Sequence, residues 1–311
     1  MESGHAASLE VRVVPLTRVS AVADEFSVEQ GECHSRKVDY LEAFEAERSV
    51  GFLGLEWSAG GNVWLWGPKI KTSGMAPAGK VARALLGEAQ QRIAQQKATL
   101  AHVMLDPSQL AEASWYTEFG YDKQITLELL VYPLAADGGA DGVDGRTANP
   151  APAESVCQSI AYKAQFHTRF SKALAASYAE SQDCLAIHRQ SDPETALADY
   201  RDTSLFNPDH WRLFQSANED FGCLLMTHHA AEASLEMVYL GLKPAFRGRG
   251  WGHWATSIAV ADAKRLDCRQ LTVAVDSQNA AARRLYTGWG FWCFDRKSVL
   301  IRTDDSWAIG P

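Results

Sequence analysis

The sequence repeats itself once, and this repeat constrains the fold more than any other feature. The segment YTEFGYDK, which begins at Tyr116, resembles the segment YTGWGFWCFDRK, which begins at Tyr286. The spacing between these tyrosines equals the spacing between Gly120 and Gly290, and upstream DPSQLAEAS falls against DSQNAAARR. Such self-similarity at a fixed offset predicts two copies of one fold in tandem.

A segment rich in Gly, Ala, Asp and Pro separates the two copies. It offers little apolar surface to bury and contains several turn-forming residues, so we expect an interdomain linker at residues 135–155. The first domain then covers residues 1–134 and the second covers residues 156–311. A chain of 311 residues is long enough for two units, each with its own core.

The composition argues against several functional classes. A formal net charge of -8 disfavours a surface that binds long polyanions, so we expect no nucleic-acid partner. The six cysteines include no C-x-x-C pair, which indicates neither a zinc site nor a dense disulfide framework, and reduced thiols in the cytoplasm are the simpler interpretation. The N-terminus lacks a signal-peptide pattern, and no apolar run approaches the roughly 18 residues of a membrane span. We therefore expect a cytoplasmic protein with no metal and no membrane partner.

Both copies show the same order of predicted elements. In the second copy, apolar and β-branched runs predict a meander of antiparallel strands, followed by a glycine loop, an amphipathic helix from Trp251 and a buried strand at 270–276. The fold class predicted is α+β (mixed α/β), in which each domain is a mostly antiparallel mixed sheet flanked by helices. The other expected strands are at 156–166, 210–216, 221–229 and 234–242 in the second copy, and at 39–47, 51–57, 62–68 and 100–106 in the first; the expected helices are at 168–181, 192–201 and 80–98.

The glycine loop FRGRGWGHW at residues 246–254 has the composition of a phosphate-binding loop. Its three glycines permit positive φ and let a phosphate approach the backbone, where NH groups meet the positive end of a helix dipole. Arg247 or Arg249 can add charge-assisted hydrogen bonds. The third glycine comes too early for a G-x-G-x-x-G fingerprint, and no Gly-Lys-Ser/Thr sequence is present for a P-loop. A tight turn with surface arginines remains the alternative.

In its context, this loop resembles the signature of the GNAT superfamily of acyl-CoA N-acyltransferases. Arg247, Gly250 and Gly252 fit the pattern Gln/Arg-x-x-Gly-x-Gly/Ala, and Asn279 and Tyr286, followed by a Gly-Phe pair, fit the helix that comes next in the family. The resemblance is specific over residues 236–297, looser over 156–235 and degraded over 39–132.

The resemblance implies acetyl-CoA, or another acyl-CoA, as co-substrate and a small-molecule or peptide amine as acceptor. The loop would hold the pyrophosphate of coenzyme A, and the edge of the preceding strand would hydrogen-bond the pantetheine amides. The implied binding residues are Leu240, Gly241, Leu242, Arg247, Gly248, Arg249, Gly250, Trp251, Gly252 and Asn279.

Direct attack of an amine on a thioester, as in the family, sets three chemical requirements. The oxyanion needs a preorganised donor, which we assign to the backbone NH of Leu240 at a bulge in the strand. The departing thiolate needs a proton, which we assign to Tyr286, with a purely packing tyrosine as the alternative. The base is less defined, because Glu236 is equally compatible with an exposed strand carboxylate, and only one of the adjacent His228 and His229 can point toward a site.

Four further aromatic residues could line an acceptor pocket, although core packing is the commoner fate of such side chains. They are His210, Trp211, Tyr239 and Trp289.

The first copy departs from the signature in its loop. We place Ala76 at the position of the loop arginine and Val81 at that of the last loop glycine, while Gly79 and Tyr116 are retained and Gln109 replaces the asparagine. We therefore expect the first domain to bind coenzyme A weakly or not at all. The retained signature in the second domain favours an N-acyltransferase, and the alternative is a coenzyme A-binding pseudoenzyme or regulatory module without turnover.

Overall fold

The computed structural model divides into two compact units. Unit 1 comprises residues 1–124, 202–204 and 298–311, and unit 2 comprises residues 125–201 and 205–297. The expected linker at 135–155 lies outside the described residues. The structure describes residues 9–18, 37–71, 76–134, 157–183, 192–203, 205–217 and 219–303.

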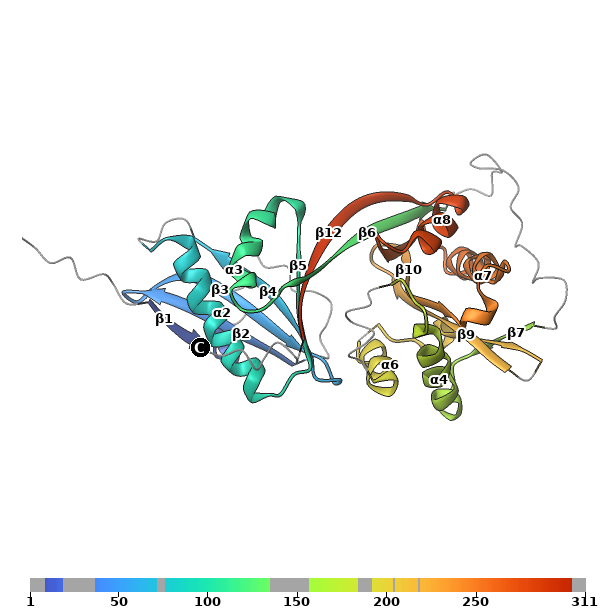
Figure 1. The fold of residues 1–311 in the computed structure, drawn as a ribbon, viewed down its shortest axis with the longest axis horizontal. Coiled ribbons are helices and arrows are strands. Elements are labelled where there is room, and N and C mark those ends of the chain that lie inside the picture. Colours follow the sequence, from blue (N-terminus) through green and yellow to red (C-terminus); the bar gives the residue numbers. More distant parts are fainter. Residues whose placement is uncertain are drawn as a thin grey trace, which may run out of the picture. The chain divides into compact units, whose positions relative to one another are not determined.

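Unit 1 has a mixed sheet with helix α2 (Ala78–Gln95) packed on one face (Figure 1). Strands β1 to β4 form the antiparallel meander, β4 pairs parallel with β5, and β5 pairs antiparallel with residues 298–303. Its strands, in spatial order, are β1 (Leu9–Val13), β2 (Lys37–Glu45), β3 (Arg48–Trp57), β4 (Asn62–Ile70), β5 (Leu100–Leu105) and the end of β12 (Trp292–Thr303).

The core of unit 1 follows from two sequence periodicities. On α2, Val81, Leu85 and Ala89 recur every four residues and are all buried, so one stripe of the helix faces the sheet. On β2, Leu41 and Ala43 are one strand period apart and face the same core.

Unit 2 has the same kind of sheet, covered by helices on both faces (Figure 1). Its strands, in spatial order, are β6 (Lys123–Pro133), β11 (Gln270–Asp276), β10 (Ser234–Leu242), β9 (Glu219–His229), β8 (Arg212–Ser216) and β7 (Cys157–Ala161). Its helices are α4 (His167–Tyr178), α6 (Pro193–Arg201), α7 (Trp251–Arg265) and α8 (Ala280–Trp289). The α+β prediction, with a mostly antiparallel mixed sheet flanked by helices, is confirmed.

The two faces of the unit 2 sheet carry separate cores. One core packs α7 and α8 against strand residues such as Leu235 and Val275, and the other packs α4 and α6 against residues such as Leu225. Both faces are therefore buried, which explains why β9 and β10 are almost continuously apolar.

The last strand of each unit comes from the other half of the sequence. Residues 125–133 precede the expected linker, yet they belong to unit 2, where β6 pairs antiparallel with β11. Residues 298–303 likewise belong to unit 1. The compact units therefore differ from uninterrupted domains at 1–134 and 156–311, because strand pairing rather than chain order decides to which sheet a strand belongs.

An ion-pair cluster fastens the incoming strand β6 to unit 2. The buried carboxylate of Glu128 on β6 accepts a hydrogen bond from Arg283 Nε on α8 at 2.7 Å. Arg296 on β12 donates to the same carboxylate at 3.2 Å. Helix α8 is thus held by a residue from the first half of the sequence.

Most predicted elements are present, with local differences in length. The strand expected at 156–166 ends at Ala161, because residues 164–166 form a 3-10 turn that leads into α4. Strands β1, β6 and β12 were not predicted. None of the helices in the described part of the chain is both long and apolar enough to cross a membrane.

Candidate active site

Strands β10 and β11 of unit 2 separate halfway along their length. Their parallel pairing runs from Ser234 opposite Gln270 to Met237 opposite Val273, and stops there. The pairing of β10 with β9 continues to Leu242. Beyond Met237, one edge of β10 is therefore without its neighbouring strand.

Three contacts establish which backbone groups line this free edge. Lys243 NH donates to Phe221 O on β9, and the carbonyl of Gly241 points toward Gly222 on the same strand. The carbonyl of Leu242 accepts instead from the Arg247 side chain, away from β9. Because backbone groups alternate along an antiparallel strand, those of Leu240 and Leu242 point to the free edge.

A register shift between Met237 and Tyr239 confirms the predicted bulge in β10. The extra residue is Val238, which lies two residues before Leu240. A bulge of this kind reverses the alternation of side chains. Accordingly, Met237 belongs to the core beneath α7, whereas Tyr239 belongs to the core beneath α4.

The glycine loop connects β10 to the N-terminus of α7. Gly248 has φ of 69° and Gly250, the N-cap of α7, has φ of 88°, so both adopt the left-handed conformation that side chains disfavour. Gly252 is different, because it lies in the first turn of the helix. A Cβ there would lie 3.1 Å from Leu285 Cδ2, so this glycine allows α7 and α8 to approach each other.

The guanidinium of Arg247 stabilises the loop through three hydrogen bonds to backbone carbonyls. Nε donates to Leu242 O at 2.9 Å, Nη1 to Glu180 O at 3.0 Å and Nη2 to Ser177 O at 2.7 Å. These bonds join the end of β10 to the end of α4. Arg247 lines the site, but its donors are directed largely at the protein rather than toward a phosphate.

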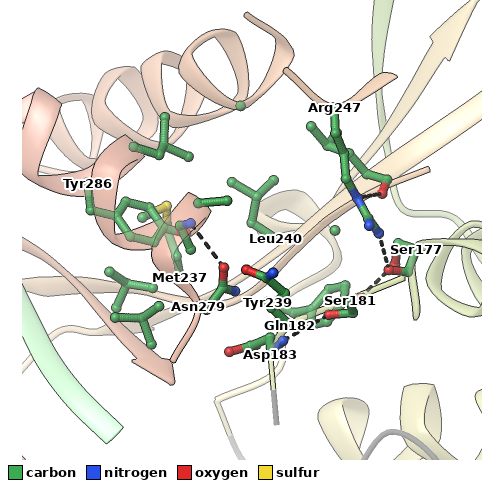
Figure 2. A pocket seen from close by; sticks show the side chains of 18 of the residues that line it. Ser177, Ser181, Gln182, Asp183, Met237, Tyr239, Leu240, Arg247, Asn279 and Tyr286 are labelled. Carbon is green, nitrogen blue, oxygen red and sulfur yellow. Dashed lines mark hydrogen bonds between the residues drawn. The ribbon is translucent and has the colours of Figure 1, made fainter. Parts of the chain in front are cut away.

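The free edge, the loop and α8 enclose a cavity of about 630 Å³. Figure 2 shows Tyr286 and Arg247 at opposite ends of it, with Leu240 between them. Among the predicted binding residues, those that line the cavity are Leu240, Gly241, Leu242, Arg247, Gly248, Gly250, Gly252 and Asn279.

Helix α8 presents two predicted residues to the cavity. Asn279 is its N-cap, and its side-chain oxygen accepts from Ala282 NH at 3.1 Å, so the asparagine fixes the start of the helix. Tyr286, two turns later, is 4% exposed and lines the cavity.

The environment of Tyr286 keeps its hydroxyl protonated. Burial, and after it the negative charge of Asp183, raises the pKa of Tyr286 above the ordinary tyrosine value. Asp183 lines the same cavity and accepts from Asp276 NH at 3.2 Å. A neutral tyrosine can donate a proton or a hydrogen bond, but it cannot act as a base in this state.

Glu236 lies on β10 before the bulge and does not line the cavity. Its carboxylate is 2.9 Å from His229 Nε2, on the neighbouring strand. His228 instead contacts His210 edge to face, with ring centroids 5.8 Å apart. The two adjacent histidines therefore point to opposite faces, as the alternation of strand side chains predicts.

Several predicted side chains lie elsewhere. Trp251 is 2% exposed and packs on Phe221, with ring centroids 4.8 Å apart, because it faces the core from the first turn of α7. Arg249 is exposed and donates to Ala245 O. Of the four aromatic residues considered for an acceptor pocket, Tyr239 lines the cavity, whereas His210, Trp211 and Trp289 are buried outside it.

Sequence reasoning missed the wall formed by the end of α4. Ser177, Glu180, Ser181, Gln182 and Asp183 all line the cavity, and Ser177 Oγ lies 2.6 Å from the hydroxyl of Tyr239. A Cβ on Gly241 would overlap both of these oxygens, which explains the glycine in the middle of β10. No sequence motif marks this wall. Its only signal is the run of small and polar residues after the apolar stripe of α4.

The corresponding place in unit 1 is built differently. Gly79 is the second residue of α2, and a Cβ there would lie 3.4 Å from Trp115 Nε1, so it corresponds to Gly252 rather than to Gly250. The N-cap is Pro77, which has no NH and φ of -56°. The alignment of Val81 with the last loop glycine is therefore wrong, since that residue faces the core.

Tyr116, the counterpart of Tyr286, is buried in unit 1 and its hydroxyl is hydrogen-bonded within the protein. It lies in the short helix α3 (Ala113–Thr117), is fully buried, and donates its hydroxyl hydrogen to Gly67 O on β4. Gln109 belongs to a capping box with Asp106. These side chains satisfy local hydrogen bonds instead of lining a cavity edge.

Among the residues that the structure describes, no group of three His, Cys, Asp or Glu side chains could hold a metal ion. The described cysteines Cys157, Cys223, Cys268 and Cys293 are free thiols.

Comparison with known proteins agrees with this geometry. A model of the acetyltransferase (GNAT) family matches residues 176–291. Mycothiol acetyltransferase of Mycobacterium leprae (strain Br4923) is 38% identical over 125 residues, which cover 36% of this chain and 40% of that protein. The chain thus matches less than half the length of the curated relatives.

Two solved structures share the fold over nearly the whole chain. A GCN5-related N-acetyltransferase from Sphaerobacter thermophilus has a TM-score of 0.61 at 12% identity and covers 95% of both chains. A tandem GNAT protein from the clavulanic acid biosynthesis pathway has a TM-score of 0.57 at 14% identity, covering 98% of this chain and 99% of its own. Residues 176–291 therefore match the acetyltransferase (GNAT) family, and the chain as a whole shares its fold with a tandem GNAT protein.

Proposed function

We propose that this chain is an acetyl-CoA-dependent N-acetyltransferase that works through unit 2. The observation that carries the proposal is the cavity between β10 and β11, which joins a glycine-capped helix, a free strand edge and a buried tyrosine. Acetyl-CoA has a chemical group for each of these features. Its diphosphate suits the loop amides, its pantetheine amides suit the edge of Leu240 and Leu242, and its thioester then lies toward Tyr286.

In the proposed reaction, the amine nitrogen attacks the carbonyl carbon of the thioester. The C–N bond forms, the carbonyl oxygen becomes negative, and a backbone NH beside the bulge, which we assign to Leu240, stabilises that charge. The C–S bond then breaks and returns the carbonyl. The products are an N-acetylated amine and the free thiol of coenzyme A.

Tyr286 is the proposed proton donor to the departing sulfur. Its position on the cavity wall and its raised pKa support this role, because the hydroxyl stays protonated until the thiolate forms. The tyrosinate then regains a proton from water, while the base that received the amine proton releases it to water.

Glu236 is the proposed base for the amine proton. Since its carboxylate lies outside the cavity lining and is paired with His229, the proton would travel through water to this Glu–His pair. A structural ion pair is the competing interpretation, and Glu236→Gln distinguishes the two. If Glu236 is the base, Glu236→Gln should greatly lower turnover while the affinity for acetyl-CoA is retained.

We propose a small-molecule amine as the acceptor, with a peptide amine as the alternative. The family-matched relative is named as a mycothiol acetyltransferase, so the acceptor of that protein belongs in any panel of test compounds. Localisation in the cytoplasm also stays a prediction, which cell fractionation can check.

The decisive experiment measures release of free coenzyme A thiol from acetyl-CoA in the presence of an amine panel. Amine-dependent thiol release that Tyr286→Phe suppresses supports the enzyme. Binding of acetyl-CoA without release for any amine would favour the pseudoenzyme. If acetyl-CoA does not bind at all, both assignments fail.

A further inference from the structure

Basic side chains line the cavity, and two of them lie outside the glycine-loop signature. Arg247, His253 and Arg284 all line it. The guanidinium of Arg247 is directed to three backbone carbonyls, as described above. His253 and Arg284 are therefore the better placed basic residues for a ligand in this cavity.

These two residues lie on α7 and α8, close to where the two helices approach each other. His253 follows Gly252, which allows the close contact with Leu285, and Arg284 precedes that leucine. On α8, Arg284 and Gly288 lie one turn apart on the same face. A Cβ at Gly288 would lie 3.9 Å from His253 Cε1, so the histidine ring lies over the turn that follows Arg284.

The partners of the neighbouring arginines make Arg284 distinctive. Arg283 donates to the carboxylate of Glu128, and Arg249 donates to Ala245 O outside the cavity. Arg284, in contrast, is an exposed side chain on the cavity lining. Its charge can therefore reach a ligand without breaking a contact that holds the fold together.

Coenzyme A carries a phosphate for which the loop has no evident place. The two phosphates of its diphosphate match the NH groups between Gly248 and Gly252, where the helix dipole also favours negative charge. The third phosphate is on the 3′ oxygen of the ribose. It must lie outside the loop. It cannot lie near Tyr286, because the proposed function puts the thioester at that end, where the carboxylate of Asp183 would also repel a phosphate.

We propose that Arg284 and His253 together bind the ribose 3′-phosphate of acetyl-CoA. The inference rests on the proposed function, because it assumes that acetyl-CoA is the ligand of the unit 2 cavity. Arginine and imidazole NH groups both donate charge-compatible hydrogen bonds to phosphate oxygens. The pair determines preference for coenzyme A over its 3′-dephospho form, and it takes no part in the chemistry of the thioester.

The test compares two ligands and three single variants of the full chain by titration calorimetry. The ligands are acetyl-CoA and 3′-dephospho-acetyl-CoA, and the variants are Arg284→Gln, His253→Gln and Lys264→Gln. Lys264 is a matched control, because it is an exposed cation at the opposite end of α7. Thermal unfolding without ligand shows whether each variant keeps its fold.

For acetyl-CoA, we expect Arg284→Gln to weaken binding about fivefold to tenfold and His253→Gln about threefold, as for solvent-accessible contacts to phosphate. For the dephospho ligand, both variants should bind as tightly as the unsubstituted chain does. Lys264→Gln should change neither affinity. Turnover should be unchanged in Lys264→Gln.

Each other outcome contradicts a defined part of the inference. Equal losses for both ligands would assign the pair to the diphosphate and overturn the 3′-phosphate site. Unchanged acetyl-CoA affinity in both Arg284→Gln and His253→Gln would remove the pair from binding altogether. Failure of the unsubstituted chain to bind acetyl-CoA would instead contradict the proposed function, so the two failures are distinguishable.

Discussion

The two units carry the same kind of sheet, and in unit 2 the separated strand edge lines a cavity that we assign to acetyl-CoA. In both units, the parallel pair separates after four paired residues, and in both a tyrosine from the following helix approaches the gap. Tyr116 donates to the strand carbonyl of Gly67, whereas Tyr286 lines a cavity. A tyrosine at this place therefore bonds to the separated strand in unit 1 and borders a cavity in unit 2.

The helix N-termini differ in a complementary way. Unit 2 has a glycine with positive φ as the N-cap of α7, and unit 1 has Pro77 as the N-cap of α2. Proline offers no NH and restricts φ to negative values. The two helix starts therefore differ in whether the N-cap residue has a backbone NH and can adopt positive φ.

The largest effect is expected from Gly250→Val. A β-branched residue is strained at φ of 88°, so the loop would lose the conformation that aims its NH groups at a phosphate. Calorimetry should show acetyl-CoA affinity reduced by at least about 100-fold. Gly79→Ala is the control in unit 1, since it lies within a helix and should leave affinity unchanged. Equal losses in both variants would contradict a difference between the two loops.

Phe in place of each tyrosine separates a chemical role from a structural one. We expect Tyr286→Phe to lower turnover on the order of 100-fold, with little change in acetyl-CoA affinity, because a proton donor is lost. Tyr116→Phe should leave turnover unchanged and lower the free energy of unfolding by about 1 to 2 kcal/mol, because a buried carbonyl loses its donor. Unchanged turnover in Tyr286→Phe would remove this residue from the mechanism.

The brace formed by Arg247 has no arginine counterpart at residues 72–77 of unit 1. Arg247→Met should weaken acetyl-CoA binding about tenfold and reduce the free energy of unfolding by about 2 kcal/mol, since three carbonyls lose a donor. Arg247→Lys tests whether the loss of binding comes from the lost hydrogen bonds or from the lost positive charge. Lysine keeps the charge but cannot reach three carbonyls in a planar fork, so it should not restore binding. Full recovery with lysine would indicate a direct charge effect on phosphate.

The smallest effect concerns pH. Burial raises the pKa of Tyr286 and of Tyr116 above the ordinary tyrosine value of about 10, which the unfolded chain retains. Their contribution to stability is therefore complete below about pH 10 and is lost as the pH rises toward the folded-state values. Urea unfolding between pH 8 and 11 should show declining stability only at the alkaline end, and Tyr286→Phe should reduce that decline. A steeper decline in the variant would contradict the assigned environment.

Local patterns were sufficient to predict the central part of the unit 2 site. Strands 234–242 and 270–276 have the predicted limits, because alternating or continuous apolar runs define a strand without long-range information. The loop glycines at 248 and 250 adopt positive φ for the same local reason. Asn279 and Tyr286 then line the cavity because the first caps α8 and the second lies two turns along it.

The remaining features depend on contacts between distant segments. The sequence did not predict that β6 belongs to unit 2 and that residues 298–303 belong to unit 1. The pairing of β6 with β11 produces no recognisable pattern in either sequence segment. The partners of Arg247 are backbone carbonyls, which any residue type supplies. Gly79 aligns with Gly252, and not with Gly250 as predicted, because the number of residues between strand and helix differs between the two copies. An alignment at one fixed offset cannot account for such a difference.

The most direct test of a single working site is the stoichiometry of acetyl-CoA binding to the full chain, measured by titration calorimetry. Unit 2 has the open cavity and the glycine N-cap, whereas unit 1 has a proline N-cap and a bonded tyrosine. We predict one equivalent of acetyl-CoA per chain, and none in Gly250→Val. Two equivalents per chain, or one equivalent that persists in Gly250→Val, would contradict the assignment of the site to unit 2.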